Sequence, residues 1–155
     1  MKYLVAILSL VFITNLSMAE VPCTDAGNGL KKIESKKGKG ILFFEGTWNE
    51  AIIKAKKEKK LIFLDTYTTW CGPCKRMEKS TFTDKDLGAY FNKHFINVKL
   101  DIENNSDGNR LANKFNITAI PTLFFLDHNE EIVTETAGFL DAETLLSIGK
   151  DAQKK

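Results

Sequence analysis

Residues 61–75 read LIFLDTYTTWCGPCK, and this stretch decides the fold. Its first four residues form an apolar run that is typical of a buried strand. Two cysteines follow, Cys71 and Cys74. Because proline is favoured in the first turn of a helix, Pro73 predicts a helix that begins within the cysteine pair and runs through Lys79. The stretch therefore predicts a strand, a short loop and a helix, with the cysteine pair where the helix begins.

The spacing of the two cysteines suits thiol–disulfide exchange. Exchange requires a thiolate that attacks a disulfide and a second thiol that resolves the mixed disulfide. At the start of a helix, free N–H groups and the helix dipole stabilise an anion, which lowers the pKa of the first cysteine. We therefore expect Cys71 to be the nucleophile and Cys74, one turn later and more buried, to be the resolving thiol. Pro73 stiffens the turn, and Gly72 lets the backbone of a partner come near.

Apolar periodicity divides the rest of the chain into strands and helices that largely alternate. The predicted strands are 41–44, 61–64, 96–102, 122–126 and 132–136. Four further helices are predicted: one that follows a cap at Thr47, one over 84–95, one over 107–115 and one that follows a cap at Asp141. The helix after Cys74 and helix 84–95 are also compatible with one kinked unit. The order βαβαβαββα predicts an α/β fold with a mixed central β-sheet and helices on both faces.

The N-terminal part differs from the rest in composition. An apolar run over 3–13, followed by small residues, is typical of a secretory signal peptide over 1–19 that is cleaved after Ala19. The run is too short for a membrane span, so none is expected in the mature chain. Residues 20–40 are rich in lysine and glycine and predict a flexible leader, after which 41–155 form one domain.

Charge and ligand patterns argue against two other classes of function. The formal net charge is only +2, and the lysine clusters at 31–39 and 54–60 lack interleaved aromatic residues, so we expect no nucleic-acid partner. A zinc site needs four ligands, and the remaining candidates Cys23, His94 and His128 are scattered along the chain. We therefore expect neither a metal nor another cofactor.

Three segments carry a resemblance to a known family. The motif WCGPCK, preceded by a strand that ends in Asp65 and followed by Ile120-Pro121-Thr122, resembles the thioredoxin superfamily over residues 41–152. The segments MEKSTFTDKDL and GFLDAETL are similar to the periplasmic thioredoxin-like domain of DsbD-type disulfide interchange reductases. The resemblance implies a thioredoxin fold and a redox-active disulfide between Cys71 and Cys74. No membrane-spanning electron-transfer domain of the DsbD type is expected in this sequence, which leaves the electron donor open.

The resemblance also implies roles for residues outside the cysteine pair. Asp65 matches the family's buried aspartate and Lys99 its neighbouring lysine, so both are expected to support proton transfer. Taken alone, Asp65 is equally compatible with a surface residue at the end of a strand, whereas Lys99, which alternates with apolar neighbours, is more typical of a solvated position. Pro121 matches the cis-proline that faces the disulfide, and Gly138 matches the glycine before the last helix. The residues expected to contact substrate are Trp70, Gly72, Pro73, Ile120 and Pro121.

Three functions are compatible with these patterns. The first is a monomeric, periplasmic or otherwise secreted enzyme that reduces disulfides of exported proteins and is itself reduced by a membrane-bound thiol donor. Gly72-Pro73 between the cysteines and Ile120 before the proline resemble reducing members of the family. The second is an oxidase or isomerase, which the oxidising character of a secreted compartment favours. The third is a binding module in which the cysteines form a permanent structural disulfide.

Overall fold

The computed structural model describes residues 39–155, and within this range it contains five helices and four strands. In chain order these elements are α1 (Trp48–Glu58), β1 (Leu61–Tyr67), α2 (Gly72–Lys79), α3 (Lys85–His94), β2 (Phe95–Asp101), α4 (Ser106–Lys114), β3 (Thr122–Leu126), β4 (Ile132–Ala137) and α5 (Ala142–Ala152). Their order agrees with the prediction after residue 44. The predicted signal peptide over 1–19 and the leader up to residue 38 lie outside the described residues.

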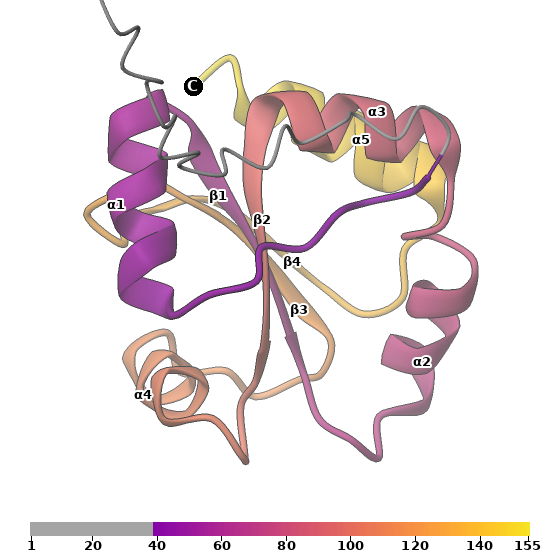
Figure 1. The fold of residues 1–155 in the computed structure, drawn as a ribbon. Coiled ribbons are helices and arrows are strands. Elements are labelled where there is room, and N and C mark those ends of the chain that lie inside the picture. Colours follow the sequence, from indigo (N-terminus) through magenta and orange to yellow (C-terminus); the bar gives the residue numbers. More distant parts are fainter. Residues whose placement is uncertain (1–38) are drawn as a thin grey trace, which may run out of the picture. The chain divides into compact units, whose positions relative to one another are not determined.

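The four strands form a mixed sheet in the order β2-β1-β3-β4. Strand β1 is parallel to β2 and antiparallel to β3, and β4 is antiparallel to β3. Figure 1 shows α1 and α4 on one side of the sheet and α2, α3 and α5 on the other. The predicted α/β class, with a mixed central sheet and helices on both faces, is therefore confirmed.

Two apolar clusters form the core, one on each face of the sheet. Successive side chains of a strand point to opposite faces, so β1 contributes to both. Phe63 packs in the cluster that α2, α3 and α5 cover, whereas Ile62 and Leu64 pack in the cluster that α1 and α4 cover. Asp65 follows Phe63 by two residues and therefore points to the same face as Phe63. This alternation places a carboxyl group beneath the helix that carries the cysteines.

The predicted strand at 41–44 is wrong. Its apolar side chains do pack against the domain, but only Phe44 donates a backbone hydrogen bond to the edge strand β2, to the carbonyl oxygen of Asn97 at 2.7 Å. The N–H of Leu42 instead donates to Oδ1 of Asn92 at 2.8 Å, and the carbonyl oxygen of Leu42 accepts from Nδ2 of Asn97 at 3.2 Å. Side-chain amides thus satisfy groups that a strand would pair in a ladder.

The segment before residue 44 is held by close backbone packing against α3. A Cβ atom on Gly88 would lie 2.3 Å from the carbonyl carbon of Gly40, a separation that only glycine permits. The carbonyl oxygen of Gly40 also accepts a hydrogen bond from Nδ2 of Asn92 at 3.1 Å. Gly40, the last residue of the predicted leader, is therefore packed against the domain.

The two helices that follow the cysteine pair are separate, so the kinked single unit is wrong. Helix α2 ends at Lys79, and α3 begins only after Asp84. Oδ1 of Asp84 accepts hydrogen bonds from the N–H groups of Asp86 at 3.0 Å and Leu87 at 2.8 Å. This side-chain cap satisfies the free donors of a helix start, which makes it a new helix and not a bend in the first.

None of the helices within residues 39–155 is long and apolar enough to cross a membrane.

Candidate active site

The cysteine pair forms a disulfide at the beginning of α2. Cys71 is the N-cap residue of this helix, with an extended backbone, and its Sγ accepts a hydrogen bond from the N–H of Cys74 at 3.1 Å. The two Cα atoms of the Cys71–Cys74 disulfide are 5.4 Å apart, and both cysteines are buried. Cys71 therefore occupies the position at which free N–H groups and the helix dipole stabilise a thiolate once the bond is reduced.

One side of the disulfide is open to an approaching partner. Gly72 and Pro73 are exposed, and a Cβ atom built on Gly72 would meet no atom within 4 Å. Trp70 is 68% exposed, although its Nε1 donates to the carboxylate of Glu103 at 3.0 Å. The indole is thus held in place with its ring in solvent. These neighbours leave room for a polypeptide beside the sulfur atoms.

The sheet register brings Pro121 to the same edge as the cysteine pair. Thr122, the first residue of β3, is paired with Thr66 near the end of β1, and the loop from β1 leads directly to Cys71. The Ile120–Pro121 peptide bond is cis, as predicted. The N–H of Gly138 donates to the carbonyl oxygen of Pro121 at 2.8 Å, with Gly138 at a φ of +91° that favours glycine. Gly138 thus fixes the loop that carries the proline.

Asp65 is a buried carboxyl group without a hydrogen-bond partner. The residue is 1% exposed, and neither of its carboxyl oxygens has a partner among the residues that the structure describes. Burial disfavours the charged form and raises the pKa of Asp65 to about 7, while the positive charge of Lys99 opposes this shift. Register pairs Asp65 directly with Lys99 on the neighbouring strand β2. The structure therefore brings together two residues that the sequence placed far apart.

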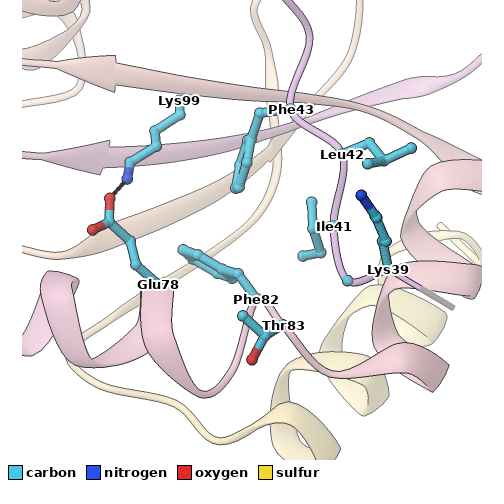
Figure 2. A pocket seen from close by; sticks show the side chains of 9 residues that line it. Lys39, Ile41, Leu42, Phe43, Glu78, Phe82, Thr83 and Lys99 are labelled. Carbon is cyan, nitrogen blue, oxygen red and sulfur yellow. Dashed lines mark ion pairs between the residues drawn. The ribbon is translucent and has the colours of Figure 1, made fainter.

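Lys99 links the buried carboxyl group to the surface. Its Nζ forms an ion pair with Oε1 of Glu78 on α2 and lies 4.4 Å from the centroid of the Tyr67 ring. Burial lowers the pKa of Lys99, and the negative charge of Asp65 opposes this shift. The ion pair lies beside a groove of about 580 Å³ whose apolar walls include Phe43 and Phe82. Figure 2 shows the ion pair and these side chains. Asp65, Lys99 and Glu78 thus lie on the neighbouring elements β1, β2 and α2, with an ion pair between the last two.

Sequence reasoning missed two acidic residues of the site. Glu78 follows Cys74 by four residues, which places both on one side of α2, so helical spacing contained a signal for it. Glu103 lies in the loop after β2, and no local pattern indicates that it holds Trp70. His94 and His128 stay outside the site, and the described residues contain no group of three or more potential ligands that could hold a metal ion.

The chain is similar to known proteins over most of the described range. The family model for a thioredoxin-like domain matches residues 48–153. The thiol:disulfide interchange protein DsbD of Actinobacillus pleuropneumoniae is 35% identical over 91 residues, which are 57% of this chain and 15% of that protein. DsbD of Yersinia pestis is 33% identical over 97 residues, 61% of this chain and 16% of that protein. The chain thus spans less than a fifth of the length of these relatives.

Two solved structures extend the comparison. A proposed disulphide-isomerase from Bacteroides thetaiotaomicron is 42% identical with a TM-score of 0.67, and the match covers 76% of this chain and 97% of that one. The oxidised C-terminal domain of DsbD from Neisseria meningitidis has a TM-score of 0.59 at 20% identity, covering 72% of this chain and 99% of that domain, and shows the fold alone. The chain belongs to the family of thioredoxin-like thiol–disulfide oxidoreductases, with Cys71 and Cys74 at the active-site position.

Proposed function

We propose that this protein reduces disulfides of exported proteins through a cycle in which Cys71 attacks and Cys74 resolves. The observation that carries the proposal is that the two cysteines occupy different positions at the start of α2. Cys71 lies at the N-terminus of α2 beside exposed residues, whereas Cys74 lies within the first turn, on the face of α2 that meets the core. The first position suits an attacking thiolate, and the second suits a thiol that reacts only with its neighbour.

The cycle begins with both cysteines reduced. The Cys71 thiolate attacks one sulfur of the substrate disulfide, forms a new S–S bond and releases the other sulfur as a thiolate, which takes a proton from solvent. Cys74 then loses its proton and attacks Sγ of Cys71. This step releases the second substrate sulfur and leaves the Cys71–Cys74 disulfide. Two electrons have passed to the substrate, and a thiol donor must supply them again.

Asp65 is suited to accept the proton of Cys74 directly or through one water molecule. A base is most effective when its pKa lies close to the working pH, and the pKa of Asp65 is raised to about 7. Lys99 stabilises the charged form of this carboxyl group. Its ion pair with Glu78 fixes the ammonium group against α2. We therefore assign Asp65 and Lys99 to proton transfer, with Glu78 as the residue that positions Lys99.

The substrate contacts follow from the open side of the disulfide. Among the described residues, no hydrogen bond uses the backbone N–H or carbonyl group of Ile120, so both are free to pair with an extended segment. Trp70, Gly72 and Pro73 are exposed and complete this surface, and Pro121, which is buried, adjoins it through Ile120. The rings of Trp70 and Pro73 offer apolar contact, and Gly72 leaves space for a backbone.

Export and the electron donor also belong to the proposal. The apolar run before Ala19 supports export, and the DsbD relatives are named for thiol:disulfide interchange. We propose a periplasmic or otherwise secreted monomer whose disulfide is reduced by a membrane-bound thiol donor. Disulfide isomerisation is a second candidate, because the Bacteroides thetaiotaomicron relative is described as a proposed disulphide-isomerase.

Turnover of a protein disulfide tests the proposal. Reduction of insulin is followed by turbidity with dithiothreitol as electron donor, for the wild-type chain and for Cys71→Ser. The matched control is Cys23→Ser, which removes a cysteine outside the described residues and is expected to leave the rate unchanged. Loss of catalysis in Cys71→Ser alone supports the enzyme. A wild-type rate that does not exceed dithiothreitol alone would favour the non-catalytic binding module. Recovery of activity in scrambled ribonuclease, measured in parallel, tests isomerisation.

A further inference from the structure

The outer face of α2 carries a row of positive charges that begins beside the disulfide. Lys75, Arg76 and Lys79 are all exposed, and together with Gly72 they follow the spacing i, i+3, i+4 and i+7 of one helix face. We call these three cations the basic face. Because Gly72 lies between the two cysteines in the sequence, the basic face begins at the same end of α2 as the disulfide.

Within residues 39–155, no acidic side chain pairs with the basic face. Among the described residues, none of its three cations takes part in an ion pair. The one acidic residue of α2 is Glu78, which is paired with Lys99 on β2. Cations without partners on a surface attract negatively charged groups of another molecule.

Arg76 also forms part of an exposed aromatic contact. Its guanidinium carbon lies 4.2 Å from the centroid of the Phe139 ring, and Phe139 is 38% exposed. The loop around Phe139 is fixed on both sides. The N–H of Gly138 donates to the carbonyl oxygen of Pro121 at 2.8 Å, and Oγ1 of Thr81 donates to the carbonyl oxygen of Leu140 at 2.6 Å. Phe139 therefore lies between the proline loop and the basic face.

An acidic residue holds the aromatic ring next to Cys71. The exposed ring of Trp70 donates through Nε1 to the Glu103 carboxylate. A polypeptide bound across the disulfide would meet an acidic group next to Trp70 and a cluster of cations next to Phe139. Such an arrangement distinguishes the two directions in which a peptide can lie, because like charges repel and unlike charges attract.

We propose that the basic face and Phe139 select polypeptide substrates that carry acidic and apolar side chains beside the reacting cysteine. The inference rests on the proposed function and names its substrate class. Arg76 and Phe139 act together: the ring fixes the guanidinium group, and its exposed edge offers apolar contact. The attraction is between exposed charges, so salt weakens it.

Two synthetic peptides test this selectivity. Each contains one disulfide loop and one leucine, and they differ only in flanking Glu-Glu or Lys-Lys. For the wild-type chain at low ionic strength we expect kcat/KM to be about tenfold higher for the acidic peptide, within the usual range of electrostatic steering. The ratio of the two kcat/KM values should fall in about 0.5 M salt, because salt screens the exposed charges. In Arg76→Glu the preference should disappear or reverse. Lys57→Glu, which changes an exposed lysine of α1, is the matched control and should keep the preference.

Binding and a neutral substrate separate this proposal from the proposed function. The oxidised protein is titrated with cysteine-free versions of the same peptides, followed by tryptophan fluorescence. Tighter binding of the acidic peptide, lost in Arg76→Glu, supports the basic face even without turnover. Equal binding, or an unchanged preference in Arg76→Glu, would overturn it. Reduction of the uncharged hydroxyethyl disulfide should be the same in wild type and Lys57→Glu, and its absence in wild type would count against the reductase instead.

Discussion

Replacing the buried carboxyl group by an amide, Asp65→Asn, should stabilise the oxidised protein in a manner that depends on pH. The pKa of Asp65 is raised from 3.8 to about 7 by burial. A folded-state pKa above the unfolded value means that the folded protein binds the proton more tightly. The wild-type protein therefore keeps its full stability below about pH 4 and loses stability as the pH rises through about 7. Above pH 7 the charged carboxylate is a net cost that asparagine does not have.

The size of the effect follows from the shift. A change from 3.8 to about 7 corresponds to about 4 kcal/mol, because one pKa unit is worth about 1.4 kcal/mol. Asp65 is almost fully buried, so little of this is screened by solvent. We therefore expect Asp65→Asn to be more stable than wild type at pH 8. Its advantage in the free energy of unfolding should be about 2 to 4 kcal/mol larger at pH 8 than at pH 4.

Urea unfolding at several pH values measures this difference. The oxidised proteins are unfolded between pH 4 and pH 8, with the exposed residue Asp86, as Asp86→Asn, as a control for the loss of a surface carboxylate. Only Asp65→Asn should show the growing difference. Substrate reduction by Asp65→Asn should also be slower at neutral pH, by about tenfold or more if Asp65 acts as a base. Both the raised pKa and the role in proton transfer would be refuted if the free energies of unfolding of wild type and Asp65→Asn changed with pH by the same amount and the pH profile of kcat/KM stayed the same.

Three further predictions concern other parts of the molecule. Cys74→Ser should accumulate covalent complexes with substrates, seen on non-reducing gels; as many complexes in Cys71→Ser would reverse the assignment of attacker and resolver. Glu130→Gln should lower the free energy of unfolding at pH 7 by about 2 kcal/mol, because hydrogen bonds from Arg110 and Lys114 lower the pKa of Glu130 to about 2; urea unfolding should show this loss fading as the pH falls from 4.5 towards 2. Gly88→Ala should lower the melting temperature by several degrees, since its Cβ would lie 2.3 Å from a backbone carbonyl carbon, whereas an equal drop in Gly72→Ala would contradict a local clash.

The parts of the fold that local chemistry determines could be predicted from the sequence. The run that ends at Asp65, the cysteine pair and Pro73 predict strand, loop and helix without knowledge of the rest of the chain. The segment 41–44 could not be assigned correctly in the same way. Its apolar residues fit a strand, but the side-chain amides of Asn92 and Asn97 compete for its backbone groups. These residues lie about fifty positions away in the sequence.

The candidate site divides along the same line. Cys71 and Cys74 follow from their spacing, and the cis bond before Pro121 follows from the resemblance. The role of the acidic residue Glu78 could not be predicted, because its ion pair depends on which side of α2 faces Lys99 on β2. Helical spacing relates Glu78 to Cys74, yet only the packing of α2 on the sheet shows that this side meets a lysine.

The reduction potential of the Cys71–Cys74 couple tests the central claim most directly. The protein is equilibrated in glutathione or dithiothreitol buffers of defined potential, its free thiols are alkylated, and the oxidised fraction is measured by mass spectrometry. For a reductase the midpoint should lie at about −270 mV, as in thioredoxin. A midpoint at about −120 mV, as in the oxidant DsbA, would contradict the account, because such a couple would pass disulfides to substrates and not remove them.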